Sequence, residues 1–533
     1  MLRKLIAVAL SAVLLSTGWL SFSGLPLLIA LVPLLWISDR AEDSRRGWWS
    51  VFRLALLTFV LWNVATVWWI WNATPVGPIA ATIVSSTLSM IAFMSFHTLS
   101  KRTSKGLSYT LLVSLWIALE YWYTTTSTNL SWPWLLLGNG FSSDIWAIQW
   151  YEYTGLFGGS LWVLLSNILF YEAWRSKNRL TWIAATVVAI SPLIISALIY
   201  FNYGESNVEH SDKFNSESSA ESIKVSVVQP NIHFGREDHP GDGERAKILL
   251  DLAAQGAEDS DFIIMPECAF PSYVYISNLE RDQFVRELRG VVDNHYSHAA
   301  LISGVSTVQF YPQGAQTATA RQSGERFYDV FNSAIYIPHG GGSPKLHHKA
   351  KLVIGTESIP FVSILKSFDS LIIDLGGSLG QLGVGAERVV FDDPAARVGA
   401  AICYEALYGA YYGEFVQNGA EAMFVISNDC WWDNTPGYRH LFSMSALRAV
   451  EHRRAIARSA NTGISGFISS RGDKIDSMGW DERGVLTGSI ELNSRLTFYT
   501  RHGDYIARIA IFMAILSLLN YMVFRIRRLN HLC

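Results

Sequence analysis

Hydrophobic and polar residues are segregated along the chain on a scale of about twenty residues. Apolar windows of this length can cross the hydrocarbon core of a bilayer as an α-helix. They recur through the first two hundred residues and once more near the end. The pattern predicts eight membrane-spanning helices, near residues 4–21, 25–38, 51–72, 78–99, 107–126, 155–174, 180–202 and 505–524.

Lysine and arginine clusters support this count. They precede the first predicted span and follow the second, fourth, sixth and eighth, whereas the connections after the third and fifth contain neither residue. Every cluster therefore falls on one face, which the positive-inside rule makes cytoplasmic. We expect both termini in the cytoplasm and the long segment before the last span outside. A cleaved signal peptide is the alternative for the first segment, but the later spans need that segment for their orientation.

The segment between the seventh and eighth spans has the pattern of an α/β domain. Residues 204–222 are polar and serine-rich, as in a linker. Strands are then predicted near 223–229, 261–266, 299–305, 331–337, 398–402, 422–427, 466–470 and 485–491, and helices near 244–257, 279–295, 408–418 and 440–458. The predicted domains are a seven-helix transmembrane domain (1–203), the linker, an α/β domain (223–503), and a C-terminal transmembrane helix with a basic cytoplasmic tail (504–533).

Two features of the apolar part leave alternatives open. Residues 129–140 are apolar but interrupted by proline and glycine, so they are either an interfacial loop or a lipid-side wall of an active site. Glu120 is the clearest ionisable residue inside a predicted span. Transporters usually have several such residues, so one isolated carboxylate argues against a transporter or receptor.

Composition and charge restrict the partners. Half of the 533 residues are hydrophobic, 16% are charged, and the formal net charge is −3. We therefore expect a lipid bilayer as a partner and no nucleic acid.

One cysteine is placed as a nucleophile. The strand-like run 397–402 leads to Cys403 at a turn, and Glu405 follows two residues later. The thiolate is the nucleophilic form of cysteine, and it needs a nearby base or positive charge. Glu267 ends another apolar strand, and Lys349 follows a Gly/Pro turn. These residue types predict an acyl-transfer site.

Other residues of similar chemistry are less well placed. Cys268 adjoins Glu267, Cys430 follows Asn428-Asp429, and Cys533 ends the chain; a disulfide between Cys268 and Cys430 is one alternative to inert thiols. Asn428-Asp429 itself is either part of a site wall or only a turn. The histidines offer no complete ligand set for a metal, so we expect neither a metal nor a cofactor: His339, His347 and His348.

Three motifs in order resemble the nitrilase (carbon–nitrogen hydrolase) superfamily. They are Met-Pro-Glu267, Lys349, and Ile-Cys403-Tyr-Glu405 followed by Ile-Ser-Asn-Asp-Cys-Trp431. Seven helices before this domain and one after it are similar to bacterial apolipoprotein N-acyltransferases. The resemblance implies an αββα sandwich outside the inner membrane, on the periplasmic side.

The resemblance also implies roles for individual residues. Cys403 would be the nucleophile, Glu267 the base and Lys349 the third member of a Glu-Lys-Cys triad. Glu405 and Glu357 match supporting glutamates of the family. Tyr404 matches the aromatic residue after the nucleophile, and its backbone N–H would join Lys349 in stabilising an oxyanion.

The implied reaction moves an acyl chain from a phospholipid, through a cysteine thioester, to the α-amine of a diacylglyceryl-modified apolipoprotein. A membrane-tethered amidase or nitrilase that uses water as acceptor is the main alternative, because the same triad would serve it. Placement beside the bilayer favours lipid substrates, since each buried CH₂ contributes about 0.8 kcal/mol to membrane retention.

Overall fold

The computed structural model describes residues 1–20, 22–126, 131–211, 221–233, 240–312, 314–358 and 381–530, without the side chains of 204–211 and 527–530. Two compact units make up the chain. The helical unit comprises Met1–Trp71, Pro75–Tyr200 and His502–Cys533, and the α/β unit comprises Asn72–Thr74 and Phe201–Arg501. Cys533 and much of the expected linker lie outside the described residues.

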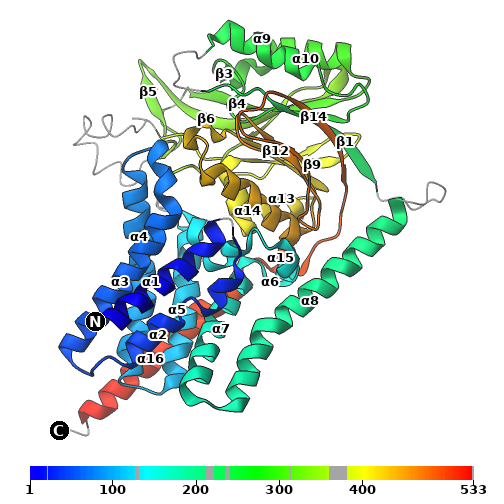
Figure 1. Cartoon of the computed structure of the whole chain (residues 1–533). Helices are drawn as coiled ribbons and strands as arrows, with labels where there is room; N and C mark the ends of the chain where they lie inside the picture. The colour runs from blue at the N-terminus through cyan, green and yellow to red at the C-terminus, as the bar shows by residue number, and fades with distance from the viewer. Residues whose placement is uncertain are drawn as a thin grey trace. The chain divides into compact units, whose positions relative to one another are not determined.

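Long apolar helices dominate the helical unit (Figure 1). Its main helices are α1 (Leu2–Ser16), α2 (Val32–Asp39), α3 (Arg45–Val67), α4 (Gly77–Ser100), α5 (Lys105–Thr125), α7 (Leu156–Ser176), α8 (Arg179–Ser211) and α16 (Tyr505–Asn530). Within the described residues, six segments are long and apolar enough to cross a membrane: Leu2–Trp19, Arg45–Asn72, Gly77–Ser100, Leu156–Ser176, Arg179–Tyr203 and Tyr505–Ile526.

The other two predicted spans differ from this group. The predicted span 25–38 contains a 3-10 turn, Leu25–Ile29, followed by the short helix α2. Each begins with a proline among its first two residues, where the missing N–H costs no helical hydrogen bond. Helix α5 is 21 residues long, as expected, but Lys105, Glu120 and several polar residues lower its hydropathy. At the end of the unit, α8 continues to Ser211, inside the segment expected to be a linker.

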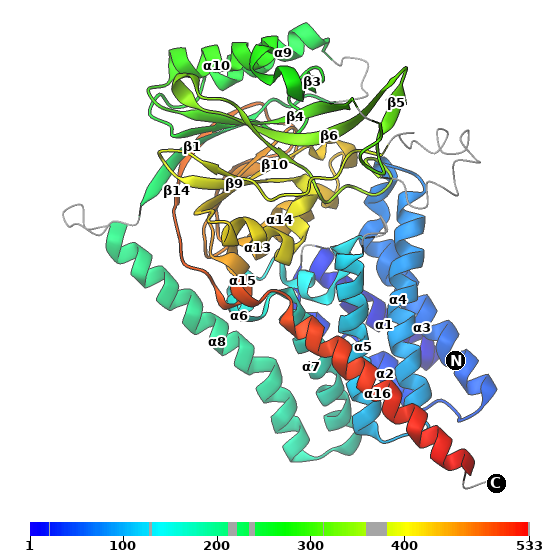
Figure 2. The same ribbon diagram turned by 180° about the vertical axis from the view of Figure 1, so that it is seen from behind.

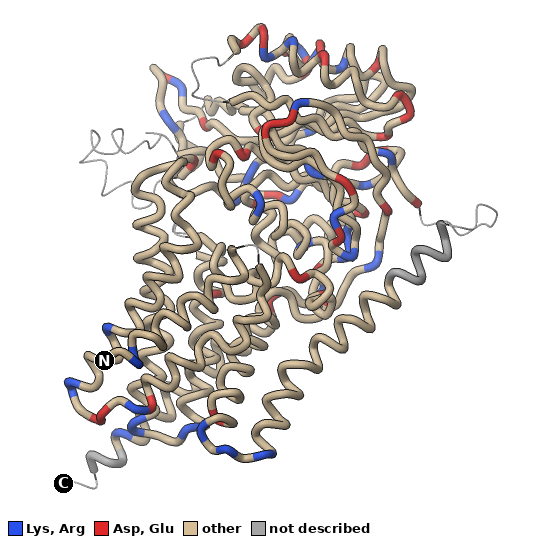
Figure 3. Tube along the Cα trace, in the orientation of Figure 1, with Lys and Arg blue, Asp and Glu red and all other residues tan. Residues whose placement is uncertain are grey.

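Basic residues gather at one end of the helical unit (Figure 3). Arg45 begins α3, Lys105 begins α5, and Arg175 lies in the last turn of α7. Arg102, just after α4, donates a hydrogen bond of 3.1 Å to the hydroxyl of Tyr521 in α16. The clusters that alternate along the sequence therefore come together in space, although the side of the membrane stays a prediction.

The described part of the proline- and glycine-broken segment, residues 131–140, is largely buried inside the helical unit. It forms 3-10 turns at Pro133–Leu135 and Leu137–Phe141, and a third turn, Ile145–Ala147, follows it. A Cβ on Gly18 would lie 2.4 Å from the carbonyl oxygen of Gly140, so the two backbones touch. Irregular backbone at membrane depth is tolerated only where protein covers it and satisfies its polar groups.

Two β-sheets face each other in the α/β unit. One has the order β14-β1-β2-β4-β6-β5, with β3 and β7 beside it, and the other has the order β13-β12-β11-β10-β9-β8. The first comprises β1 (Ser222–Gln229), β2 (Phe262–Ile264), β3 (Val274–Tyr275), β4 (Ala300–Tyr311), β5 (Arg321–Ser323), β6 (Arg326–Ile337), β7 (Lys345–His348) and β14 (Gly484–Glu491). The second comprises β8 (Val390–Asp392), β9 (Arg397–Ile402), β10 (Ala422–Ser427), β11 (Ile456–Ala460), β12 (Ser465–Ile468) and β13 (Lys474–Met478).

Helices cover the outer face of each sheet. Figures 1 and 2 show α9 (Asp242–Ala253) and α10 (Gln283–His295) along the first sheet, and α13 (Gly409–Gln417) and α14 (Pro436–His452) along the second. Between the sheets, the rings of Phe262 and Phe424 pack edge to face with centroids 5.2 Å apart. This is the αββα sandwich expected from the sequence.

One predicted helix was too long. It was expected over 440–458, but α14 ends at His452, and Arg453 adopts the left-handed conformation at φ 51°. The chain then forms β11, which pairs in parallel with β10. Arg458 lies in this strand and Arg454 two residues before it, and both are charged residues of good helix propensity whose side chains are internal.

Candidate active site

Cys403 stands at a sharp corner where β9 ends. Ile402 is the last residue of the strand, and Cys403 begins the 3-10 turn Cys403–Leu407. Its φ of +50° lies in the left-handed region, which is uncommon for residues with a side chain. Because surrounding structure must hold such a conformation in place, residues of this kind cluster at functional sites. The side chain is only 4% exposed.

The two charged residues of the predicted triad also follow strands. Glu267 comes three residues after β2, and Lys349 follows β7 directly. The Lys349 ammonium lies 2.9 Å from Glu267 Oε1, and both side chains are buried. Lys345 and Lys351, the competing lysines, point elsewhere: Lys351 lies over the ring of Tyr408, 4.7 Å from its centroid, and Lys345 is exposed.

A second carboxylate contacts the same ammonium. Glu357 accepts a hydrogen bond of 3.0 Å from Lys349 Nζ, and its other oxygen accepts one of 2.8 Å from the backbone N–H of Val353. Burial lowers the pKa of Lys349, but the charges of Glu267 and Glu357 outweigh it and raise that pKa well above its usual value. Lys349 is therefore a fixed cation between two anions.

Asn332, which the sequence analysis missed, separates these two carboxylates. Its Nδ2 lies 2.7 Å from Glu267 Oε1 and 2.7 Å from Glu357 Oε1. An amide that donates to both like-charged groups holds them close together without adding charge. The available signal was a lone asparagine in the apolar strand β6, where an unpaired amide would be costly.

All three triad residues line one cavity of about 240 Å³ in the α/β unit. Glu357, Cys268, Asn332 and Asn428 line it too, and the exposed rings of Tyr273 and Trp431 stand at its wall. Of the two readings for Asn428, the site wall is therefore the one observed. Its backbone N–H donates to Glu267 Oε2 at 2.9 Å, so Glu267 is held from two sides.

Burial and charge act on the cysteine thiol in opposite directions. Burial raises the pKa of Cys403, the negative charge of Glu267 raises it further, and the ammonium of Lys349 lowers it less than these two raise it. The thiol is consequently protonated in the resting protein. A base must remove its proton at the moment of attack, and the cavity supplies Glu267 for that purpose.

Glu405 and Tyr404 are not among the residues that line this cavity in the described parts of the chain. Glu405 is fully buried, and its two oxygens accept hydrogen bonds from the N–H groups of Ala350 (2.7 Å) and Ile402 (2.8 Å). These are the neighbours of Lys349 and Cys403. Glu405 thus connects the lysine loop to the cysteine corner.

The histidines and the other cysteines that the sequence offered as candidates do not come together in one site. Nε2 of His347 lies 3.3 Å from Glu405 Oε2, Nδ1 of His348 lies 2.7 Å from the Ser333 hydroxyl, and His339 contacts a backbone carbonyl. No cluster of three or more His, Cys, Asp or Glu suited to a metal occurs among the described residues. No disulfide links the cysteines that the structure describes.

A glycine sets the position of Glu267, and this can be tested. A Cβ at Gly304 would lie 2.5 Å from the Cα of Glu267 and 2.7 Å from the carbonyl oxygen of Pro266. Gly304→Ala must therefore displace the backbone that carries Glu267. We expect a loss of activity and a loss of about 1–3 kcal/mol in stability. Gly290→Ala is the control, because no heavy atom lies within 4 Å of its added methyl group; equal activity of the two variants would contradict this role.

Comparison with known proteins adds the family context. Residues 224–496 match the carbon-nitrogen hydrolase family, and residues 11–169 match the apolipoprotein N-acyltransferase N-terminal domain. Apolipoprotein N-acyltransferase of Chlorobaculum tepidum is 27% identical over 494 residues, covering 91% of this chain and 90% of that protein. The protein of the same name from Geobacter metallireducens is 25% identical over 548 residues, covering 99% and 97%. A crystal structure of Saccharomyces cerevisiae Nit3, of the nitrilase superfamily, is 15% identical with a TM-score of 0.37, covering 52% of this chain and 93% of that one.

Proposed function

Because this chain belongs to the carbon-nitrogen hydrolase family and resembles apolipoprotein N-acyltransferases along most of its length, we propose that it is a lipoprotein N-acyltransferase. It would transfer an acyl chain from a phospholipid to the N-terminal α-amine of a diacylglyceryl-cysteine lipoprotein. Six long apolar helices among the described residues support a membrane location. The basic clusters favour a catalytic domain on the periplasmic side of the bacterial inner membrane.

The observation that carries this proposal is a buried ammonium shared by two carboxylates in the cavity that holds Cys403. Such a site can move a proton and stabilise negative charge without a metal ligand set. In the proposed first half-reaction, Glu267 takes the Cys403 proton while the sulfur attacks the ester carbonyl. Lys349 and the Tyr404 N–H stabilise the oxyanion. The C–O bond breaks, Glu267 returns the proton to the departing oxygen, and lysophospholipid leaves a thioester.

The second half-reaction regenerates the enzyme. The α-amine of the acceptor attacks the thioester carbonyl, and Glu267 accepts the proton that the amine loses. The C–S bond then breaks, an amide forms, and the sulfur recovers a proton from Glu267. This is a ping-pong sequence with one covalent intermediate. Glu357 and Asn332 would hold the side chains of Lys349 and Glu267 in position during both half-reactions. Glu405 would hold the lysine loop and the cysteine corner together from outside the cavity.

The proposal predicts an acyl adduct on one cysteine. When the purified protein is mixed with a phospholipid of defined chains and no acceptor, its intact mass should rise by one acyl group. Peptide mapping should place the adduct on Cys403. Adding a diacylglyceryl peptide should remove the adduct and acylate the peptide. Rapid loss of the adduct to water, with release of free fatty acid and no peptide acylation, would instead support a hydrolase.

A further inference from the structure

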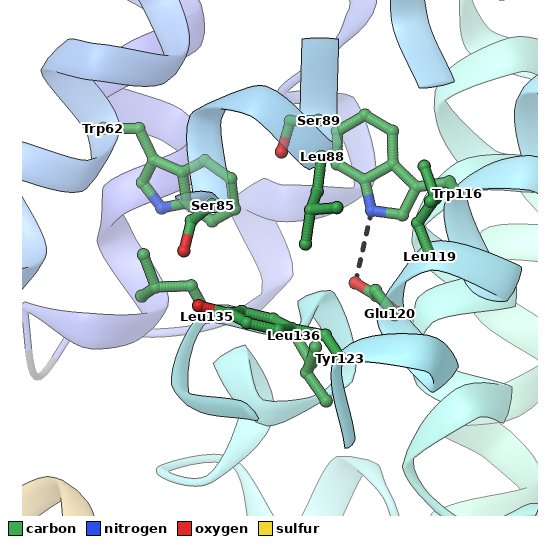
Figure 4. A pocket seen from close by; sticks show the side chains of 10 residues that line it. All are labelled: Trp62, Ser85, Leu88, Ser89, Trp116, Leu119, Glu120, Tyr123, Leu135 and Leu136. Atoms are coloured by element: carbon green, nitrogen blue, oxygen red, sulfur yellow. Dashed lines mark hydrogen bonds between the residues drawn. The ribbon is translucent and has the colours of Figure 1, made fainter. Parts of the chain in front are cut away.

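The helical unit contains a small cavity with polar walls that the proposed reaction does not use (Figure 4). It lies among α3, α4, α5 and the broken segment at Leu135–Leu136, and its volume is about 30 Å³. A polar cavity of this size has room for one or two water-sized groups. Glu120, the isolated carboxylate that the sequence analysis singled out, forms part of its wall.

Only one of the two carboxylate oxygens of Glu120 accepts hydrogen bonds from the protein. Its Oε1 accepts hydrogen bonds from Trp116 Nε1 (3.2 Å) and from the backbone N–H of Leu137 (2.8 Å). Its Oε2 has no partner in hydrogen-bonding geometry among the described residues, although the Ser160 hydroxyl lies nearby. The side chain is only 7% exposed. Bulk water therefore cannot supply the missing partner.

Two other buried atoms in the cavity wall have the same property. Nε1 of Trp62 has no hydrogen-bond partner among the described residues, and Oγ of Ser85 has none in hydrogen-bonding geometry, although the Tyr123 hydroxyl lies nearby; the side chains are 2% and 8% exposed. Figure 4 shows these side chains and that of Glu120 around one space. Buried polar atoms are rarely unpaired, and three around one cavity indicate a shared ligand.

The chemistry of the three atoms restricts that ligand. A carboxylate oxygen only accepts hydrogen bonds, whereas an indole N–H only donates. A ligand that satisfies both must donate and accept, which excludes an ammonium group, a carboxylate and a phosphate. We propose that this cavity binds one oxygen ligand, a water molecule or a lipid hydroxyl group, that donates to Glu120 Oε2 and accepts from Trp62 Nε1.

A water ligand can be tested by radiolytic hydroxyl-radical labelling of the intact protein in detergent. Bound water becomes a radical source in place, so Trp62 and Tyr123 should be oxidised several-fold faster than Trp69. Trp69 is an internal control, since it is 1% exposed and its Nε1 donates to the Thr66 carbonyl at 2.8 Å. Ser85→Val, which fills the cavity, should bring the Trp62 rate down to that of Trp69.

A lipid hydroxyl gives a different result. Native mass spectrometry should then show a retained lipid with a free hydroxyl, such as a lysophospholipid or a diacylglycerol, and Trp62 should stay unlabelled. Trp62→Phe keeps an aromatic ring but removes the indole N–H and part of the side-chain volume, so it should release that lipid, whereas Trp69→Phe, which loses the same volume at a site that is also buried, should retain it. If Trp62 labels no faster than Trp69 and no hydroxyl-bearing lipid is retained, the proposal is wrong.

A second observation, in the α/β unit, concerns Asn428 and rests on the proposed function. The backbone of Ile232 fixes the amide of Asn461: its N–H donates to Asn461 Oδ1 at 3.0 Å, and its carbonyl accepts from Asn461 Nδ2 at 2.6 Å. Asn461 Nδ2 also donates to Asn428 Oδ1 at 3.0 Å. This chain of bonds sets the orientation of the Asn428 amide, which would otherwise be ambiguous.

The result is an unused donor at the reaction site. Asn428 is 1% exposed and lines the Cys403 cavity, and its Nδ2 has no hydrogen-bond partner among the described residues. A donor held in place before substrate arrives can stabilise charge as it develops. We infer that Asn428 Nδ2 donates a hydrogen bond to the oxygen of the carbonyl that Cys403 attacks, beside Lys349.

Single-turnover acylation of Cys403, followed by intact mass, tests this role. Asn428→Ala should slow acylation by about 10²-fold, the usual effect of removing one oxyanion donor. The half-saturating phospholipid concentration should change little, and the melting temperature should fall only slightly, because the Asn461 amide keeps its bond to the Ile232 carbonyl. Asn428→Asp should slow it further, because an acceptor replaces the donor. Asn418→Ala is the matched control, since this exposed asparagine only caps the Arg388 carbonyl.

The outcomes separate the two proposals. If the unaltered protein forms the Cys403 adduct and Asn428→Ala forms it at the same rate, the Asn428 role is wrong and the acyltransferase stands. If slow acylation is accompanied by a large fall in melting temperature and recovers on cooling, Asn428 is only structural. If the unaltered protein forms no adduct, both proposals fall.

Discussion

Cys403→Ala is expected to abolish acyl transfer, with a loss on the order of 10⁴-fold or more, because no covalent intermediate can form without the nucleophile. Folding should survive the change. Burial raises the pKa of Cys403, so the resting thiol is neutral and its removal leaves no charge unpaired. The measurement is transfer of a labelled acyl chain from phospholipid to a diacylglyceryl peptide, together with the melting temperature.

A matched cysteine variant makes this result specific. Cys430→Ala removes a thiol that does not line the cavity, and it should retain activity. Cys268 does line the cavity, and burial raises its pKa as well. Substantial transfer by Cys403→Ala that disappears in the Cys268→Ala, Cys403→Ala double variant would reassign the nucleophile to Cys268.

Lys349→Met should remove both activity and stability. The substitution leaves Glu267 and Glu357 facing each other without their shared cation, in a site where Lys349 itself is fully buried. Breaking a buried ion pair by deleting one partner costs about 3–5 kcal/mol. The free energy of unfolding should therefore fall by that amount, which denaturation in detergent would measure.

Two further variants separate the stability effect from catalysis. Lys351→Met removes a lysine that packs on Tyr408, so it should leave the carboxylates paired and most activity intact. Adding Glu267→Gln and Glu357→Gln to Lys349→Met should restore much of the stability but none of the activity. If the Lys349→Met variant is as stable as the unaltered protein, Glu267 and Glu357 are not both ionised in the folded protein.

Part of the site was predictable because two of its members, Glu267 and Cys403, come at the ends of predicted strands. Glu267 and Cys403 follow strands that the sequence pattern indicates, whereas Lys349 was expected after a Gly/Pro turn and the strand β7 before it was not predicted. Asn332 was not predictable in the same way. Its function depends on β6 pairing with β4 and β7, which brings it to Glu267 from 65 positions away in sequence. Single-sequence patterns report local periodicity and contain little about such pairings.

The errors in secondary structure have the same origin. The helix predicted over 440–458 includes the first residues of β11, among them the charged Arg458. In the folded protein, Arg458 pairs with Asp429 at 3.0 Å and Arg454 donates to the Ala420 carbonyl at 2.7 Å, both fully internal. Partners distant in sequence thus made a buried strand compatible with charge. The predicted span 25–38 was divided instead by a local feature, the prolines at 26 and 33.

The left-handed backbone at Cys403 restricts which nucleophilic residues can occupy this corner. A φ of +50° is a severe outlier for a β-branched side chain, so threonine is excluded there on steric grounds alone. Serine has the same unbranched Cβ as cysteine and fits, and a single base change in a cysteine codon produces it. An exchange of sulfur for oxygen at this corner is therefore open to serine and closed to threonine.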